Sequence, residues 1–220
     1  MNTLFDLLEN FKSEIAKLSL EELREHYKAN KLLWLLAAIR GVKLEGIAGE
    51  ALEKVKIKRA RFYAGIGSRR TPEHVLEIMA LIAEQLERKG FILRSGGAIG
   101  ADKAFEKGAK RKQIFRPEHA KEWCFREINT VLPKGRPPLE KMRPYVRGLL
   151  GRNAMQILGP DGDSPVDFVV CWTPEGRDDG GTGYAIRLAW KYGIPVYNLR
   201  NPDQAREFSE KFGIDVGDLK

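Results

Sequence analysis

Apolar residues recur at two different spacings in this chain, and the change of spacing falls near residue 59. Before that point the apolar positions repeat at helical intervals, beginning with Leu4, Leu7, Leu8, Phe11 and Ile15. Ser19 followed by Glu22 has the pattern of a capping box at the start of a second helix, and the apolar stretch 31–40 predicts a third. Residues 1–58 are therefore expected to form a small N-terminal helical region.

From residue 59 onward, short apolar runs that favour strands alternate with longer amphipathic runs that favour helices. Thr71 and Pro72 are expected to begin one helix, with Thr71 as its N-cap and proline at its first position. The alternation predicts an α/β domain over residues 59–220, with a Rossmann-like parallel sheet and helices on both faces. Strands are expected at 61–66, 91–94, 113–115, 166–172 and 194–199. Helices are expected at 71–89, 101–108, 117–129, 139–158, 184–192 and 203–212.

Three polar, glycine-rich loops follow predicted strands, where ligands of parallel sheets bind. In the first glycine loop, residues 65–72, Gly67 lets the backbone approach a ligand closely and Ser68 offers a hydroxyl. Arg69 adds charge-assisted donors near the start of a helix, which itself favours anions. The alternative is an ordinary tight turn between strand and helix.

The second glycine loop, residues 95–102, lies where a phosphate-cradling loop belongs, although it is not a Walker loop because Gly-Lys-Ser/Thr is absent. Gly96, Gly97 and Gly100 would let backbone amides point inward, and Ser95 adds a hydroxyl. Asp102 has two interpretations, as a structural cap or as a carboxylate that faces a ligand and either binds a sugar hydroxyl or acts as a base.

The third loop, residues 171–183, leaves the most apolar strand and enters a helix through Gly-Gly-Thr-Gly. Amides around Gly181 and Thr182 would close a second anion site. Trp172 is a candidate for stacking on a base, with core packing as the alternative. Glu175 is a candidate for acid or base catalysis, with a solvated acidic loop as the alternative.

The net charge of +8 is unevenly distributed. Residues 103–152 hold 14 lysines and arginines against 5 acidic residues, a pattern that attracts polyanions. Within this segment Arg147 and Arg152 are candidates for phosphate or sugar contacts. A solvated basic surface is the alternative interpretation of the same residues.

At the three loops the sequence resembles the SLOG superfamily. The resemblance is carried by Tyr-Ala-Gly-Ile-Gly-Ser-Arg at 63–69, Ser-Gly-Gly-Ala-Ile-Gly-Ala-Asp at 95–102 and Gly-Gly-Thr-Gly-Tyr-Ala-Ile-Arg-Leu-Ala at 180–189. That superfamily includes the DNA-processing protein A (DprA) group and the Lonely Guy phosphoribohydrolases, and this chain is most similar to phage-type, DprA-like proteins. The resemblance implies a Rossmann-like fold that binds nucleotides or single-stranded DNA near the glycine loops.

The resemblance also separates two functions. Lonely Guy enzymes cleave an N-glycosidic bond with a glutamate after their glycine motif, and this sequence has Ala185 at that place. A DprA-like binder of DNA, more than of RNA, is therefore the first expectation. An N-glycosidic hydrolase or transferase using Asp102 or Glu175 is the alternative, and a nucleotide-signal sensor is a further one.

Composition and residue spacing also limit the classes of protein to which this chain is expected to belong. No metal-ligand spacing and no cofactor motif is apparent, so neither a metal nor a cofactor is expected. No apolar run is long enough to cross a membrane, and Cys124 and Cys171 lie in apolar surroundings, which favours a reduced, cytoplasmic protein. The N-terminal helices are candidates for contact with a second copy of the chain or with a protein partner.

Overall fold

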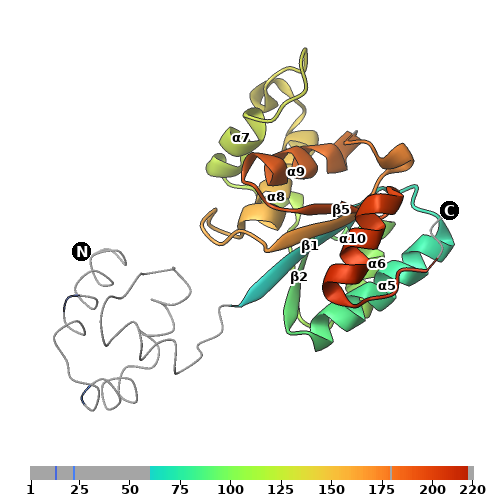
Figure 1. Ribbon diagram of the computed structural model, residues 1–220. Coiled ribbons are helices and arrows are strands. Elements are labelled where there is room, and N and C mark those ends of the chain that lie inside the picture. The colour runs from blue at the N-terminus through green and yellow to red at the C-terminus, as the bar shows by residue number, and fades with distance from the viewer. Residues whose placement is uncertain (1–12, 14–21, 23–59, 179, 218–220) are drawn as a thin grey trace. The chain divides into compact units, whose positions relative to one another are not determined.

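The computed structural model describes residues 13, 22, 60–178 and 180–217 (Figure 1). In the N-terminal region only Ser13 and Glu22 are described, and both are helical. The other predictions for residues 1–58 lie outside the described residues. The chain divides into two units, Met1–Ala60 and Arg61–Lys220. The sheet, the helices that cover it and the candidate site all lie in the second unit.

This second unit is an α/β fold built on a five-stranded parallel sheet, as predicted. The strand order is β3-β2-β1-β4-β5, so the first strand lies at the centre. Its Ala64 is level with Arg94 on one side and with Val169 on the other. The strands are β1 (Arg61–Gly67), β2 (Phe91–Ser95), β3 (Lys112–Ile114), β4 (Phe168–Trp172) and β5 (Val196–Asn198).

Helices cover both faces of the sheet (Figure 1). One face packs against α5 (Glu73–Arg88), α6 (Ala101–Gly108) and α10 (Pro202–Phe212). The other packs against α8 (Pro144–Leu158) and α9 (Gly180–Lys191), and α7 (Glu122–Asn129) packs on these two helices. Three short 3₁₀ turns lie between these elements: η1 (Pro117–His119), η2 (Leu139–Lys141) and η3 (Pro174–Gly176).

The two faces have different cores because successive strand residues point to opposite sides. Tyr63 packs into the α5–α6–α10 core, whereas its neighbour Ala64 packs into the α7–α8–α9 core. Aromatic rings fill the first core: the ring of Phe168 lies 5.1 Å from that of Phe91 and 4.4 Å from that of Phe212. Burial on both faces holds the ends of β1, β2 and β4 in fixed positions, and these ends carry the three loops.

The strand order creates a topological switch point between β1 and β4. The chain runs outward from β1 to β2 and β3, then crosses to the other side of β1 to form β4 and β5. Loops that follow β1 and β4 therefore diverge to opposite faces of the sheet. A crevice is expected where they separate, beyond the carboxyl ends of the strands.

The prediction that Thr71 caps the following helix is wrong. Helix α5 begins two residues later, and its N-cap is Pro72, which provides no side-chain hydrogen bond. The Thr71 hydroxyl instead donates to the backbone oxygen of Ser68 at 2.8 Å. A threonine hydroxyl can donate to a nearby backbone oxygen as readily as it can accept from a helix amide. Here the hydroxyl bonds within the first glycine loop, and it does not cap the helix.

Three other predicted helices differ from the observed elements. The helix expected over 117–129 is divided into η1 and α7, with Ala120 and Lys121 extended between them. The helix expected over 139–158 is divided into η2 and α8, because Pro144 holds the preceding Arg143 in an extended conformation and is itself the first residue of α8. The helix expected from Tyr184 begins at Gly180, so the glycines belong to its first turn.

Candidate functional site

A cleft of about 1150 Å³ opens at the carboxyl ends of β1 and β4. It is lined by the first glycine loop, the third loop, α8 and α9. Eight of the predicted site residues line the cleft: Gly67, Ser68, Arg69, Asp102, Arg152, Glu175, Gly181 and Thr182. The other predicted site residues, Ser95, Gly96, Gly97, Gly100, Arg147 and Trp172, lie outside its lining.

The first glycine loop is packed against its neighbours. A Cβ on Gly67 would lie 2.6 Å from the Cβ of Ala101 and 2.8 Å from the backbone oxygen of Trp172. The Ser68 amide donates to that same oxygen at 3.0 Å, and the Ser68 hydroxyl accepts from the Arg70 amide at 3.0 Å. Gly67 is therefore required by the close approach of the neighbouring segments.

The first turn of α9 is fastened to this loop and to α8. The Thr182 hydroxyl donates to the backbone oxygen of Gly67 at 2.9 Å. The Asn153 side-chain amide, on α8, donates to the backbone oxygen of Gly181 at 2.9 Å. Sequence reasoning did not select Asn153 for the site. Its position directly after the candidate Arg152, between the apolar residues of the predicted helix, was the signal that could have found it, because buried polar groups are paired.

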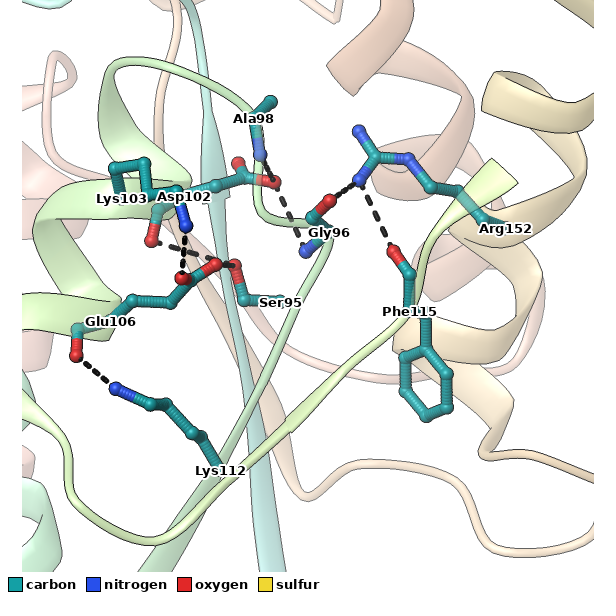
Figure 2. Close-up of polar contacts among 9 residues, drawn as sticks. All are labelled: Ser95, Gly96, Ala98, Asp102, Lys103, Glu106, Lys112, Phe115 and Arg152. Carbon is teal, nitrogen blue, oxygen red and sulfur yellow. Dashed lines mark hydrogen bonds and ion pairs between the residues drawn. The ribbon is translucent and has the colours of Figure 1, made fainter. Parts of the chain in front are cut away.

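Asp102 holds the second glycine loop (Figure 2). Its Oδ2 accepts from the amide of Gly96 at 3.1 Å and from that of Ala98 at 3.4 Å. Burial raises the pKa of this carboxyl to about 6, against the lowering effect of the Arg152 guanidinium and of backbone amides. The side chain thus caps the loop amides and also lines the cleft, so it combines parts of both interpretations.

Arg152 fixes the other side of this loop (Figure 2). Its Nη1 donates to the backbone oxygens of Gly96 and Phe115, the second at 3.3 Å. Ser95 lies deeper, with its hydroxyl 3.5 Å from Glu106 Oε1. A Cβ on Gly100 would lie 2.6 Å from the backbone oxygen of Ser68, which brings the first two loops into contact.

Arginine dominates the charge of the cleft. Six arginines and three carboxylates line it: Arg69, Arg70, Arg136, Arg152, Arg177, Arg187, Asp102, Glu175 and Asp178. Two of the arginines are neutralised locally, Arg187 by Asp178 at 2.8 Å and Arg177 by Glu175 at 2.6 Å.

The remaining exposed arginines of the cleft are Arg69, Arg70 and Arg136. Within residues 60–178 and 180–217, none of the three forms an ion pair. Three exposed cations at one cleft create a local positive potential that attracts anions.

Glu175 has an unusual backbone. Among the described residues it is the one non-glycine residue with positive φ, at φ 56° and ψ 16°. Such a conformation costs free energy and is over-represented at functional sites. The residue sits in η3, where its exposed carboxylate pairs with Arg177.

Two predicted contact residues lie elsewhere. Arg147 stacks on the ring of Phe125 at 4.1 Å and pairs with Glu122 at 3.3 Å, so it joins α8 to α7 outside the cleft. Trp172 is 7 % exposed and packs into the α5–α6–α10 core. It lines a separate, smaller pocket.

No family model matches this chain, and no curated protein does either. A solved structure that is similar to it is that of DNA processing protein A from Helicobacter pylori, described for its single-stranded DNA binding mode. The two are 19 % identical over 73 % of this chain and 77 % of that chain, with a TM-score of 0.45.

Membrane-spanning and metal-binding features are both missing from the described residues. No helix in that part of the chain is long and apolar enough to span a membrane. No group of three or more histidine, cysteine or acidic side chains there is placed to hold a metal ion.

Proposed function

We propose that the cleft binds a phosphate-bearing ligand, either a nucleotide or a segment of single-stranded nucleic acid, with DNA preferred over RNA. The observation that carries this proposal is the set of three exposed arginines without an ionic partner among the described residues, Arg69, Arg70 and Arg136, on a cleft at the switch point of a parallel sheet. Guanidinium groups recognise phosphate through charge and paired donors.

The start of α9 supports the same ligand. A Cβ placed on Gly180 or on Gly181 would meet no atom within 4 Å, so these two residues of the first turn border open space. Unpaired amides and the helix dipole both favour an anion there. The amides of Gly96 and Ala98 are already bound by Asp102. These contacts favour α9 and the first glycine loop as the phosphate site.

Charge beyond the cleft favours a polymer. Lys134, Lys141 and Arg143 are exposed in the connection between α7 and α8, close in sequence to the cleft residues Arg136 and Met142. Several exposed cations beside a cleft are typical of proteins that follow a nucleic-acid backbone.

Binding of a labelled single-stranded DNA oligonucleotide, measured by fluorescence anisotropy at several salt concentrations, tests the proposal. The double variant Arg69→Ala, Arg70→Ala is expected to bind more weakly and to show a smaller salt dependence. The slope of log affinity against log salt should fall by about 0.7 for each phosphate that the variant no longer neutralises.

The matched control is Lys89→Ala, Lys107→Ala, which removes the same charge from exposed positions at the ends of α5 and α6. Its slope should stay close to that of the unaltered protein. An equal weakening of binding in the two double variants would show that net charge, rather than the cleft, governs binding, and the proposal would be abandoned.

A second candidate function is hydrolysis of an N-glycosidic bond, favoured by two carboxylates of the cleft. Asp102 has a pKa raised to about 6 by burial, as suits a general acid near neutral pH. Glu175 contributes a second carboxylate from a strained turn. Protonation of a leaving base and stabilisation of an oxocarbenium-like sugar both call for such groups.

Mass spectrometry of free base tests this second candidate. The protein would be incubated with nucleotides and with single- and double-stranded oligonucleotides, modified bases included. Release that disappears in Asp102→Asn or Glu175→Gln supports an enzyme. Retention of oligonucleotides with no release from any substrate would leave binding as the function.

A further inference from the structure

A second, smaller hollow lies at the carboxyl end of β4. Its volume is about 280 Å³, below the roughly 300–1,000 Å³ of pockets that take a whole small ligand. It therefore suits one ring system of a larger molecule. The lining residues are Pro72, His74, Val75, Trp172, Pro174, Glu175 and Arg200.

This pocket and the cleft share one wall. Pro174 and Glu175, in η3, line both of them. The pocket lies on the side of the sheet edge that faces α5, whereas the cleft lies on the side that faces α8 and α9. A ligand anchored in the cleft thus has a second hollow directly beyond η3.

Asn198, which is buried at the end of β5, fixes the position of this wall. Its side-chain amide donates to the Thr173 hydroxyl at 2.6 Å. Its side-chain oxygen accepts from the amides of Thr173 at 3.3 Å and of Arg200 at 3.2 Å. The backbones on two sides of the pocket are held by the same side chain, so its shape is built into the fold.

The chemistry of the pocket fits a flat heteroaromatic ring. Val75, Trp172 and Pro174 supply apolar surface, and the exposed Glu175 and Arg200 supply an acceptor and donors. The indole Nε1 of Trp172 is buried and has no hydrogen-bond partner among the described residues.

We propose that this pocket is a subsite for the nucleobase of the ligand whose phosphate occupies the cleft. The inference rests on the proposed function and deepens it. The apolar walls bind the faces of the base, and the Glu175 carboxylate accepts from an amino group on its edge. Arg200 donates to a carbonyl or ring nitrogen. Base recognition and phosphate recognition then meet at η3, which explains why a glutamate is held at positive φ there.

Isothermal titration calorimetry with ribose 5-phosphate and with the four nucleoside 5′-monophosphates tests the subsite. In the unaltered protein at least one nucleoside monophosphate is expected to bind about tenfold more tightly than ribose 5-phosphate, as stacking of one base on an aromatic residue supplies. The variant His74→Trp places an indole at the exposed rim of the pocket. It should reduce this ratio to about one, with the affinity for ribose 5-phosphate unchanged.

The matched control is Glu77→Trp, an exposed position one turn further along α5 and outside the pocket lining. It should keep the tenfold ratio. Equal affinities for ribose 5-phosphate and all four monophosphates in the unaltered protein would overturn the subsite and leave the proposed function standing. The subsite is also refuted if both tryptophan variants keep the ratio. No binding of any of these ligands, nor of the DNA oligonucleotide, would remove the proposed function and the subsite with it.

Discussion

Replacing Asp102 by asparagine should change the pH dependence of stability in a way that follows from its burial. The side chain is 4 % exposed, and desolvation raises the pKa of its carboxyl from 3.8 to about 6. The folded protein therefore holds this proton more tightly than the unfolded chain does. Stability contributed by this group is complete below the unfolded pKa and is lost as the pH rises to about 6.

The size of the effect follows from the two pKa values. A rise from 3.8 to about 6 corresponds to about 3 kcal/mol over the whole titration. Between about pH 4.5 and pH 7.5 the unaltered protein should lose about 2 kcal/mol of unfolding free energy through this one group.

The variant Asp102→Asn lacks the ionisable proton, while its side-chain oxygen can still accept from the amides of Gly96 and Ala98. Its unfolding free energy minus that of the unaltered protein should therefore increase by about 2 kcal/mol between pH 4.5 and pH 7.5. Urea unfolding at four or five pH values, followed by circular dichroism, measures this difference.

The exposed Asp161, which pairs with Lys121, provides the control, because Asp161→Asn removes one negative charge without relieving a buried one. A difference for Asp102→Asn that is flat with pH, or that falls as pH rises, would refute the reasoning. The carboxyl would then ionise as easily in the folded protein as in the unfolded chain.

Substitutions at four further positions give outcomes that stability and binding assays can check. Gly100→Ala should destabilise the protein by about 3 kcal/mol in urea unfolding, because φ is +91° and the new Cβ meets a backbone oxygen at 2.6 Å. Gly135→Ala, at φ +80° with open space around it, should cost only about 1 kcal/mol, and equal costs would contradict this account. Thr182→Val should cost about 1 kcal/mol and Thr182→Ser much less, because the hydroxyl donates to Gly67. Arg147→Met should lower stability by about 1 kcal/mol, while oligonucleotide affinity, read by anisotropy, stays within about twofold because the residue lies outside the cleft.

The fold was predictable because its signals are local. Strand β4 is a run of five buried residues ahead of a polar loop, and α6 starts directly after a glycine loop and ends at Gly108. The convergence of the first and third loops also followed from the sequence, because parallel strands bring their carboxyl ends to one edge.

The details of the site depend on contacts between distant segments, which spacing along the chain does not reveal. The basic segment 103–152 made Arg147 a candidate for phosphate contacts, but the sequence could not show that its guanidinium would stack on Phe125. Arg136 was not selected, because its place on the cleft depends on how the connection between α7 and α8 folds back. The sequence predicted that Gly67 lets the backbone approach a ligand. In the structure it is Ala101 that occupies the space a side chain at this position would need.

The bond from Thr182 to Gly67 spans 115 positions of the chain. It requires β4 to lie beside β1, because Gly67 ends β1 and Thr182 lies in α9, the helix that follows β4. Contacts between segments so distant in sequence slow folding, because a long loop must be closed before they form. Formation of the cleft therefore depends on the pairing of β1 with β4. A fragment that ends before β4 would retain the first two glycine loops. It would still lack the cleft, because the third loop and α9, which line the cleft, follow β4.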